Sequence, residues 1–162
     1  MKKLLLSYAE YNLWANEQLT VVLNNIDKPL HFETVISSFP NLLATLEHIW
    51  QAEYVWKLRI LNQGPSVKPS FPTKETKALV ETLLQVNKEW IEFVQTISDE
   101  KLEEIANYNN WQGTPFSTPV CQIIHHVFNH STFHRGQLIT MLRQLGVTTL
   151  PSTDYITYTR IV

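Results

Sequence analysis

The chain has 162 residues, a formal net charge of −2, 44% hydrophobic residues and 17% charged residues. That length suits one domain with a sizeable core, and the composition is too apolar and too aromatic for a disordered chain. Lys and Arg form no run, so the chain lacks the basic patch typical of nucleic-acid binders. We therefore expect a single folded domain over residues 1–162 that does not bind nucleic acid.

Cysteine usage and the N-terminal sequence favour a cytoplasmic protein. Cys121 is the single cysteine, so an internal disulfide framework is excluded. Only three leucines follow Met1-Lys2-Lys3 before Ser7, which is short of a signal-peptide core. The longest apolar runs fall well below the roughly 18 residues needed to cross a bilayer. We therefore expect no membrane association.

Long segments without glycine or proline predict four helices. The first two are expected at about 3–25 and 40–62, with Pro40 at the first helical position of the second. Residues 63–73 contain one glycine and three prolines, which predicts a linker across the end of a bundle. A third helix is expected at 74–97, with a short helical piece after it at 98–101.

A hairpin-like stretch separates the third and fourth long helices. Residues 105–116 are rich in Tyr, Asn, Trp, Thr and Phe, a composition that favours a hairpin over a helix. Thr118 and Pro119 predict the N-cap and first position of a helix that runs to about 145 and stops at Gly146. The sequence thus predicts an all-α four-helix bundle with a short hairpin-like insertion before the last long helix.

Four of the six histidines lie in one ten-residue stretch of the last predicted helix: His125, His126, His130 and His134. His126, His130 and His134 step by four, so they lie on one face of the helix. Two histidines one turn apart can ligate one metal ion, whereas the outer pair lies roughly 12 Å apart along the axis and cannot. His125 lies about 140° round the helix from His130 and is not expected at the site.

A third ligand must come from another helix. His48 is the only other histidine expected inside a helix, because His31 falls in a loop. Together with His130 and one neighbour, His48 predicts a three-histidine metal site with a position open to water or substrate. Spacing leaves open whether His126 or His134 completes it. The competing interpretation is that these are ordinary surface or half-buried histidines.

Three polar residues are candidates for supporting this site. Gln137 follows His134 by three residues, so its amide is placed to orient a ligand or a bound water. Asn12 and Asn16 lie one turn apart in the first predicted helix and are candidates for contacts behind the ligands. Solvent exposure is the competing interpretation for all three side chains.

Three segments resemble the DinB family, also called DinB/YfiT-like metalloenzymes: Tyr11-Asn12-Leu13-Trp14-Ala15-Asn16, Leu46-Glu47-His48-Ile49-Trp50-Gln51-Ala52-Glu53, and residues 126–137, which read HVFNHSTFHRGQ. The resemblance covers nearly the whole chain. It implies a four-helix bundle of unusual connectivity, a homodimer, and one divalent metal ion held by His48, His130 and His134. His126 then becomes a neighbour of the site. The family often has a second histidine where this chain has Phe133.

The resemblance also implies a function, because relatives include transferases and isomerases that use low-molecular-weight thiols such as bacillithiol or mycothiol. We expect a metal-dependent thiol transferase acting on a small-molecule substrate, since a bound cation lowers the pKa of a thiol. A metal-dependent hydrolase and a non-enzymatic, stress-induced binding module are the alternatives. Zinc or nickel is favoured, and imidazole ligands also accept iron, manganese or copper. Spacing assigns no general base.

Overall fold

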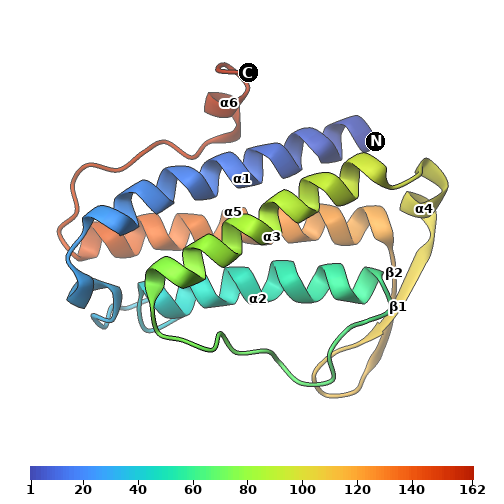
Figure 1. Cartoon of the computed structure of the whole chain (residues 1–162), viewed down its shortest axis with the longest axis horizontal. Coiled ribbons are helices and arrows are strands. Elements are labelled where there is room, and N and C mark those ends of the chain that lie inside the picture. The colour runs from blue at the N-terminus through green and yellow to red at the C-terminus, as the bar shows by residue number, and fades with distance from the viewer.

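The computed structural model describes all residues 1–162, and four long helices make up most of it (Figure 1). They are α1 (Lys2–Asn25), α2 (Leu42–Ile60), α3 (Thr76–Thr96) and α5 (Val120–Gln144). The short helices are η1 (Lys28–His31), α4 (Asp99–Glu103) and α6 (Tyr155–Tyr158). Strands β1 (Ile105–Asn109) and β2 (Pro115–Pro119) form an antiparallel hairpin. The predicted four-helix bundle with a hairpin before its last long helix is confirmed.

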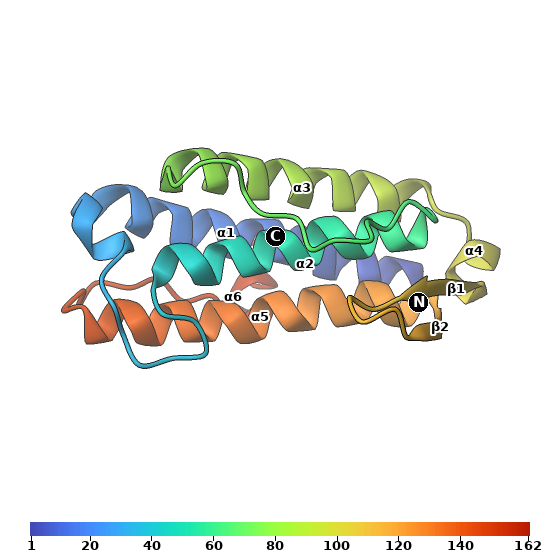
Figure 2. The same ribbon diagram turned by 90° about the horizontal axis from the view of Figure 1, so that it is seen from below.

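The long helices are connected in an unusual order. α1 packs against α3 and α5, and α2 packs against the same two helices (Figures 1 and 2). The consecutive helices α1 and α2 therefore lie at diagonal corners, whereas in a simple up-and-down bundle consecutive helices are neighbours. This order brings α2 and α5 side by side although they are far apart in the sequence. None of the helices combines the length and the apolar character that a membrane span requires.

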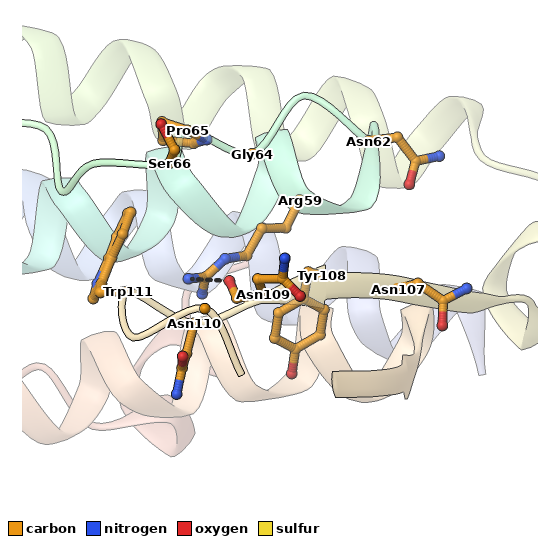
Figure 3. Close-up of a pocket in the computed structure, with 11 residues that line it drawn as sticks. Arg59, Asn62, Gly64, Pro65, Ser66, Asn107, Tyr108, Asn109, Asn110 and Trp111 are labelled. Carbon is orange, nitrogen blue, oxygen red and sulfur yellow. Dashed lines mark hydrogen bonds between the residues drawn. The ribbon is translucent and has the colours of Figure 1, made fainter. Parts of the chain in front are cut away.

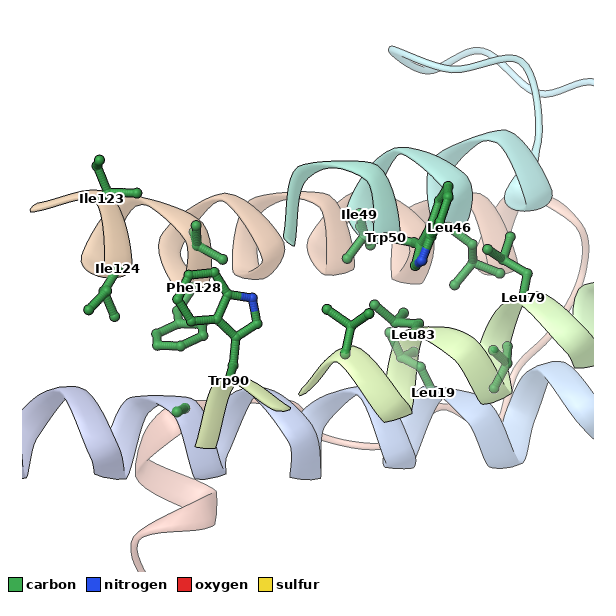
Figure 4. Close-up of a cluster of buried hydrophobic side chains, with 14 of the residues drawn as sticks. Leu19, Leu46, Ile49, Trp50, Leu79, Leu83, Trp90, Ile123, Ile124 and Phe128 are labelled. Atoms are coloured by element: carbon green, nitrogen blue, oxygen red, sulfur yellow. The ribbon is translucent and has the colours of Figure 1, made fainter. Parts of the chain in front are cut away.

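A large apolar core of 27 buried residues holds the bundle together (Figure 4). Trp90 of α3 is fully buried and meets Phe128 of α5 edge to face, with ring centroids 5.7 Å apart. Its indole N–H donates to the backbone carbonyl of Glu53 at 3.1 Å. Aromatic pairs of this kind stabilise a core beyond their buried area, so Trp90 fixes α3 against both α2 and α5.

Two predicted helix starts are wrong. The side chain of Asn41 accepts a hydrogen bond from the backbone N–H of Ala44 at 2.9 Å, so α2 begins at Leu42 and Pro40 lies outside it. Thr118 and Pro119 belong to β2, where they pair with Ala106 and Ile105. The α5 helix consequently begins at Val120 without a side-chain cap. Strand pairing has taken the residues that local capping preferences assigned to the helix.

Two glycines have positive φ angles, one after α5 and one in the turn of the hairpin. Gly146 has φ +85° directly after the last turn of α5, which confirms the predicted stop. Gly113 has φ +82° in the turn between β1 and β2, where the side chain of Asn110 accepts hydrogen bonds from the backbone N–H groups of Gln112 and Thr114. Residues other than glycine rarely adopt such φ values, so both positions favour glycine.

Candidate metal centre

Three histidine side chains from α2 and α5 converge at one point. The Nε2 atom of His130 lies 3.1 Å from Nε2 of His48 and 3.2 Å from Nε2 of His134. One nitrogen from each of the three side chains lies within 4.8 Å of the other two. The structure thus brings together His48, His130 and His134, and His126 is not part of the group.

These spacings fit a shared metal ion. Nitrogen ligands held about 2.0 to 2.1 Å from one tetrahedral ion lie roughly 3.3 Å from each other. A proton on Nε2 of His130 could form a good hydrogen bond to only one of its two neighbours, because an imidazole N–H is a single donor. A cation, in contrast, can accept all three lone pairs. The three histidines could therefore hold a metal ion.

Gln137 fixes the orientation of one of these histidines. Its amide nitrogen donates to the hydroxyl of Ser38 at 2.8 Å, so its amide oxygen faces Nδ1 of His134, also at 2.8 Å. Nδ1 of His134 must then carry the proton, and Nε2 presents its lone pair to the centre. Nδ1 of His48 and Nδ1 of His130 are buried without a hydrogen-bond partner. Gln137 consequently supports one of the three histidines.

The environment keeps these histidines neutral. Burial first, and then the charges of neighbouring histidines, lower the pKa of His130 to about 3. Burial first, and then the positive charges of His134 and Lys68, lower the pKa of His48 to about 4. Burial also lowers the pKa of His134, and its hydrogen bond to Gln137 opposes that shift. Neutral imidazole is the form that binds metal ions.

Two phenylalanines flank the centre. The ring of Phe39 lies 4.5 Å from that of His48 and 5.7 Å from that of His134, so it packs against both rings. Phe133 is 62% exposed, and its ring lies 5.0 Å from that of His134. Phe133 therefore lies beside His134 at the edge of the centre that faces solvent.

His126 adjoins the centre, because its ring centroid lies 5.6 Å from that of His130, whereas His125 and His31 have other surroundings. The ring of His126 packs edge-on against Trp56 at 5.2 Å. His125 is exposed and lies near Tyr8. His31 is buried, with Nε2 at 2.9 Å from the carbonyl of Leu23 and Nδ1 at 2.7 Å from the hydroxyl of Thr76. His31 thus joins η1 to α1 and α3.

Asn12 and Asn16 do not hydrogen-bond to the histidines. The amide of Asn12 donates to the carboxylate of Glu53 at 2.9 Å, and that of Asn16 donates to the side-chain oxygen of Asn87 at 2.8 Å. Both also accept hydrogen bonds from the guanidinium of Arg135. Both asparagines instead belong to a separate buried network, and its members Ser131 and Arg135 directly follow His130 and His134 along α5.

Two cavities lie along α2 and share Arg59 and Trp111 as wall residues. The smaller has a volume of about 120 Å³ and reaches His48 and His130, with Lys68 at its edge. The larger, of about 380 Å³, lies between the hairpin and residues 62–66 (Figure 3). No carboxylate lines either cavity. The charged side chains in their walls are those of Arg59 and Lys68, and both are cations.

Sequence reasoning missed Arg59, Lys68 and Trp111. Arg59 follows His48 by 11 residues, which is about three turns of helix, so the two share one face of α2. That spacing could have identified Arg59 as a neighbour of the site. Trp111 lies in the turn of the hairpin, and only the folding of that hairpin against α2 brings it to the cavity.

Comparisons with known proteins agree with this architecture. The profile of the DinB family matches residues 1–161. The sequence is 29% identical to Protein DinB of Bacillus subtilis (strain 168) over 154 residues, which cover 90% of this chain and 88% of that protein. The fold is similar to a DinB-like protein from Bacillus cereus, with a TM-score of 0.64 and 22% identity over 85% of this chain and 89% of that one.

A second solved structure has the same fold at lower identity. YfiT from Bacillus subtilis is described as a probable metal-dependent hydrolase with an unusual four-helix bundle topology. It matches with a TM-score of 0.62 and 11% identity, over 87% of this chain and 87% of that one. The family profile spans almost the entire sequence, and the helix order and the histidine group accompany it. This chain belongs to the DinB family.

Proposed function

We propose that this protein is a metal-dependent enzyme in which His48, His130 and His134 hold one divalent ion and which transfers a small thiol to an electrophile. The observation that carries the proposal is the convergence of three Nε2 atoms beside a cavity that reaches two of those histidines. Three neutral histidines leave a further position for a ligand, which is typical of catalytic rather than structural sites. Zinc or nickel suits this ligand set best, and iron, manganese and copper are compatible with it.

The lining of the cavity supports thiol chemistry. A bound divalent ion would lower the pKa of a thiol and so supply the thiolate nucleophile. The sulfur would form the new bond to carbon, the leaving group would depart with its electron pair, and the thiol proton would pass to solvent. A thiol needs only modest activation, since its ordinary pKa is about 8.5. Arg59 and Lys68 favour negative charge in the cavity, and the absence of a carboxylate there is compatible with a reaction that needs no general base.

Hydrolysis is the second candidate, and the structural similarity to YfiT, described as a probable metal-dependent hydrolase, is the observation that favours it. A water in the position of the thiol would then be the nucleophile. The same three histidines would serve both reactions. The two candidates differ in whether a free thiol is consumed.

Metal content is the first test. Protein purified without an affinity tag should contain about one divalent ion per chain by elemental analysis, because three histidines supply enough ligands for one ion. His130→Ala should lose that metal. His125→Ala is the matched control, because His125 is an exposed histidine of the same helix, and it should keep the metal. Wild-type protein that stays empty after dialysis against zinc and nickel would contradict the proposal and favour a non-enzymatic module.

Substrate turnover is the second stage of the same test. Metal-loaded protein should accelerate the loss of free thiol across a panel of electrophiles, and His130→Ala should not. If metal binds but no thiol is consumed, while esters or amides are cleaved, the hydrolase is the correct function and the transferase is wrong.

A further inference from the structure

Arg59 is a buried cation without a carboxylate partner. Only 8% of the residue is exposed. The three ion pairs of the chain are Lys28–Glu75, Lys57–Glu89 and Lys101–Glu104. The one hydrogen bond from its guanidinium runs from Nη2 to the backbone carbonyl of Asn109, at 3.3 Å. None of its nitrogens is both fully buried and without a partner, so its free N–H groups are open to water or to a ligand in the two cavities that Arg59 lines.

Three aromatic rings surround the guanidinium. Its central carbon lies 4.5 Å from the ring centre of Trp56. It lies 5.2 Å from the ring centre of Tyr108 and 5.1 Å from that of Trp111, and Figure 3 shows these two side chains beside Arg59. Aromatic faces attract a cation and so offset part of the cost of burial. They do not satisfy the N–H donors in the guanidinium plane, of which an arginine has five. The rings thus hold a planar donor group that retains unused hydrogen-bonding capacity.

The same guanidinium lies between the two cavities. Arg59 and Trp111 line both of them, and the smaller one continues to His48 and His130. Lys68 adds a second positive charge at the edge of the smaller cavity. A molecule in this space could therefore contact Arg59 with one group and the histidine centre with another. The larger cavity has room for the rest of an organic molecule among the polar residues Asn107, Asn109 and Asn110.

We infer that the molecule bound here is an organic anion whose carboxylate is held by Arg59, with Lys68 adding to the attraction, while a second group of the same molecule reaches the histidine centre. A planar guanidinium fixed between aromatic rings is suited to two parallel hydrogen bonds with a carboxylate. Gly64 leaves room for the Arg59 side chain, because a Cβ atom at this position would lie 2.9 Å from Cγ of Arg59. The part concerning the histidine centre rests on the proposed function, whereas the carboxylate site on Arg59 does not.

Two thiols that differ in charge test the inference. Zinc-loaded wild-type protein should bind mercaptosuccinate at least about tenfold more tightly than the neutral 1-thioglycerol, because charged hydrogen bonds to Arg59 are available only to the former. Both titrations can be followed by calorimetry or by tryptophan fluorescence, since Trp56 and Trp111 border the site. Arg59→Gln should lose the preference and keep its affinity for zinc and for 1-thioglycerol.

Control variants separate binding from folding. Arg59→Lys keeps the charge without the planar fork and should show an intermediate preference, and Arg143→Gln, at an exposed position on α5, should match the wild type. Lys68→Gln, in an exposed segment, should weaken the preference without changing the unfolding temperature. This variant keeps the inference testable if Arg59→Gln fails to fold. An unchanged preference in both Arg59→Gln and Lys68→Gln would overturn the inference.

A titration of metal-free protein distinguishes this inference from the proposed function. Succinate should bind metal-free wild type and bind Arg59→Gln at least about tenfold more weakly, because the carboxylate contact does not need the metal. That result would stand even if the chain took up no zinc and the proposed enzyme were wrong. Conversely, zinc-loaded protein that consumes thiols but binds succinate equally well with and without Arg59 would overturn the inference and leave the proposed function intact.

Discussion

Two polar clusters occupy neighbouring turns of α2 and α5, the first fully buried and the second half-buried, and their hydrogen bonding differs. In the first, the carboxylate of Glu53 accepts hydrogen bonds from Asn12 of α1, Asn87 of α3 and Ser131 of α5, so all four long helices contribute. In the second, three imidazole nitrogens face one another. The first cluster satisfies its central acceptor with groups of the chain itself, and the second presents lone pairs to a common point.

Arg135 sets the direction of the hydrogen bonds in the Glu53 cluster. Its guanidinium donates to the side-chain oxygens of Asn12 and Asn16, which turns their amide nitrogens away from it. Asn12 then donates to Glu53, and Asn16 donates to Asn87, whose own amide nitrogen donates to Glu53. Burial raises the pKa of Glu53, while these donors and the charge of Arg135 oppose the rise.

This comparison distinguishes a polar cluster that stabilises the fold from one that can bind a ligand. A polar network whose members satisfy most of one another's hydrogen bonds rigidifies a core. In the Glu53 cluster only Nε of Arg135 is buried without a partner. A group of converging acceptors with few donors is completed only by a cation. We therefore expect changes in the Glu53 cluster to lower stability with the metal retained, and changes around the histidines to lower metal affinity with stability retained.

The largest effect on stability is expected for Glu53→Gln. A glutamine side chain has one acceptor oxygen and one donor amide, so its amide would face another donor, and Arg135 would lose its attraction to the charge of Glu53. Breaking a buried, charged network in this way costs about 3 kcal/mol in the free energy of unfolding. Urea denaturation measures that loss, and elemental analysis should still find the metal.

A matched control makes this measurement specific. Glu81→Gln makes the same chemical change at an exposed position of α3 and should alter the free energy of unfolding by less than about 0.5 kcal/mol. If Glu53→Gln were as mild as Glu81→Gln, the network would not be what joins the four helices. Loss of metal in Glu53→Gln with stability unchanged would reverse the roles of the two clusters.

A smaller effect, on metal affinity alone, is expected for Gln137→Ala. Loss of the hydrogen bond to Nδ1 of His134 frees that ring to rotate or to change tautomer, and changes of this kind typically weaken metal binding about 10- to 100-fold. Competition with a chromophoric chelator measures the affinity. Gln122→Ala, at an exposed position of the same helix, should bind metal as the wild type does. Unaltered affinity in Gln137→Ala would mean that packing alone orients His134.

The sequence predicted the helices well and their ends less well, for a physical reason. Long segments without glycine or proline locate helices through local propensity, and all four long helices lie within two residues of the predicted bounds. Local propensity does not fix the first residues of α2 and α5. The side chain of Asn41 caps α2 one residue after Pro40, and the residues before α5 belong to a strand. Strand pairing takes Thr118 and Pro119, and only the folded hairpin shows this.

The candidate site could likewise be predicted from the sequence only in part. Spacing along one helix places His130 and His134 a turn apart, but it cannot decide between His126 and His134, because that choice depends on where α2 crosses α5. The shared helix face of His48 and Arg59 could be predicted from the sequence. The approach of Trp111 from the hairpin could not, since it is a tertiary contact without a local signal.

The smallest expected effect concerns the histidine cluster, and it is a change in how the stability of the metal-free protein depends on pH. In metal-free protein the folded histidines have lowered pKa values, about 4 for His48 and about 3 for His130. The unfolded chain therefore binds more protons than the folded one below the ordinary histidine pKa of about 6.5, and the free energy of unfolding falls as the pH falls. This contribution is complete above pH 6.5 and is lost towards the folded pKa values. His130→Gln removes one such group, so its stability should fall less between pH 7 and pH 5.5 than that of the wild type. Urea denaturation after dialysis against a chelator measures both slopes, and equal slopes would show that His130 is not held neutral by the fold.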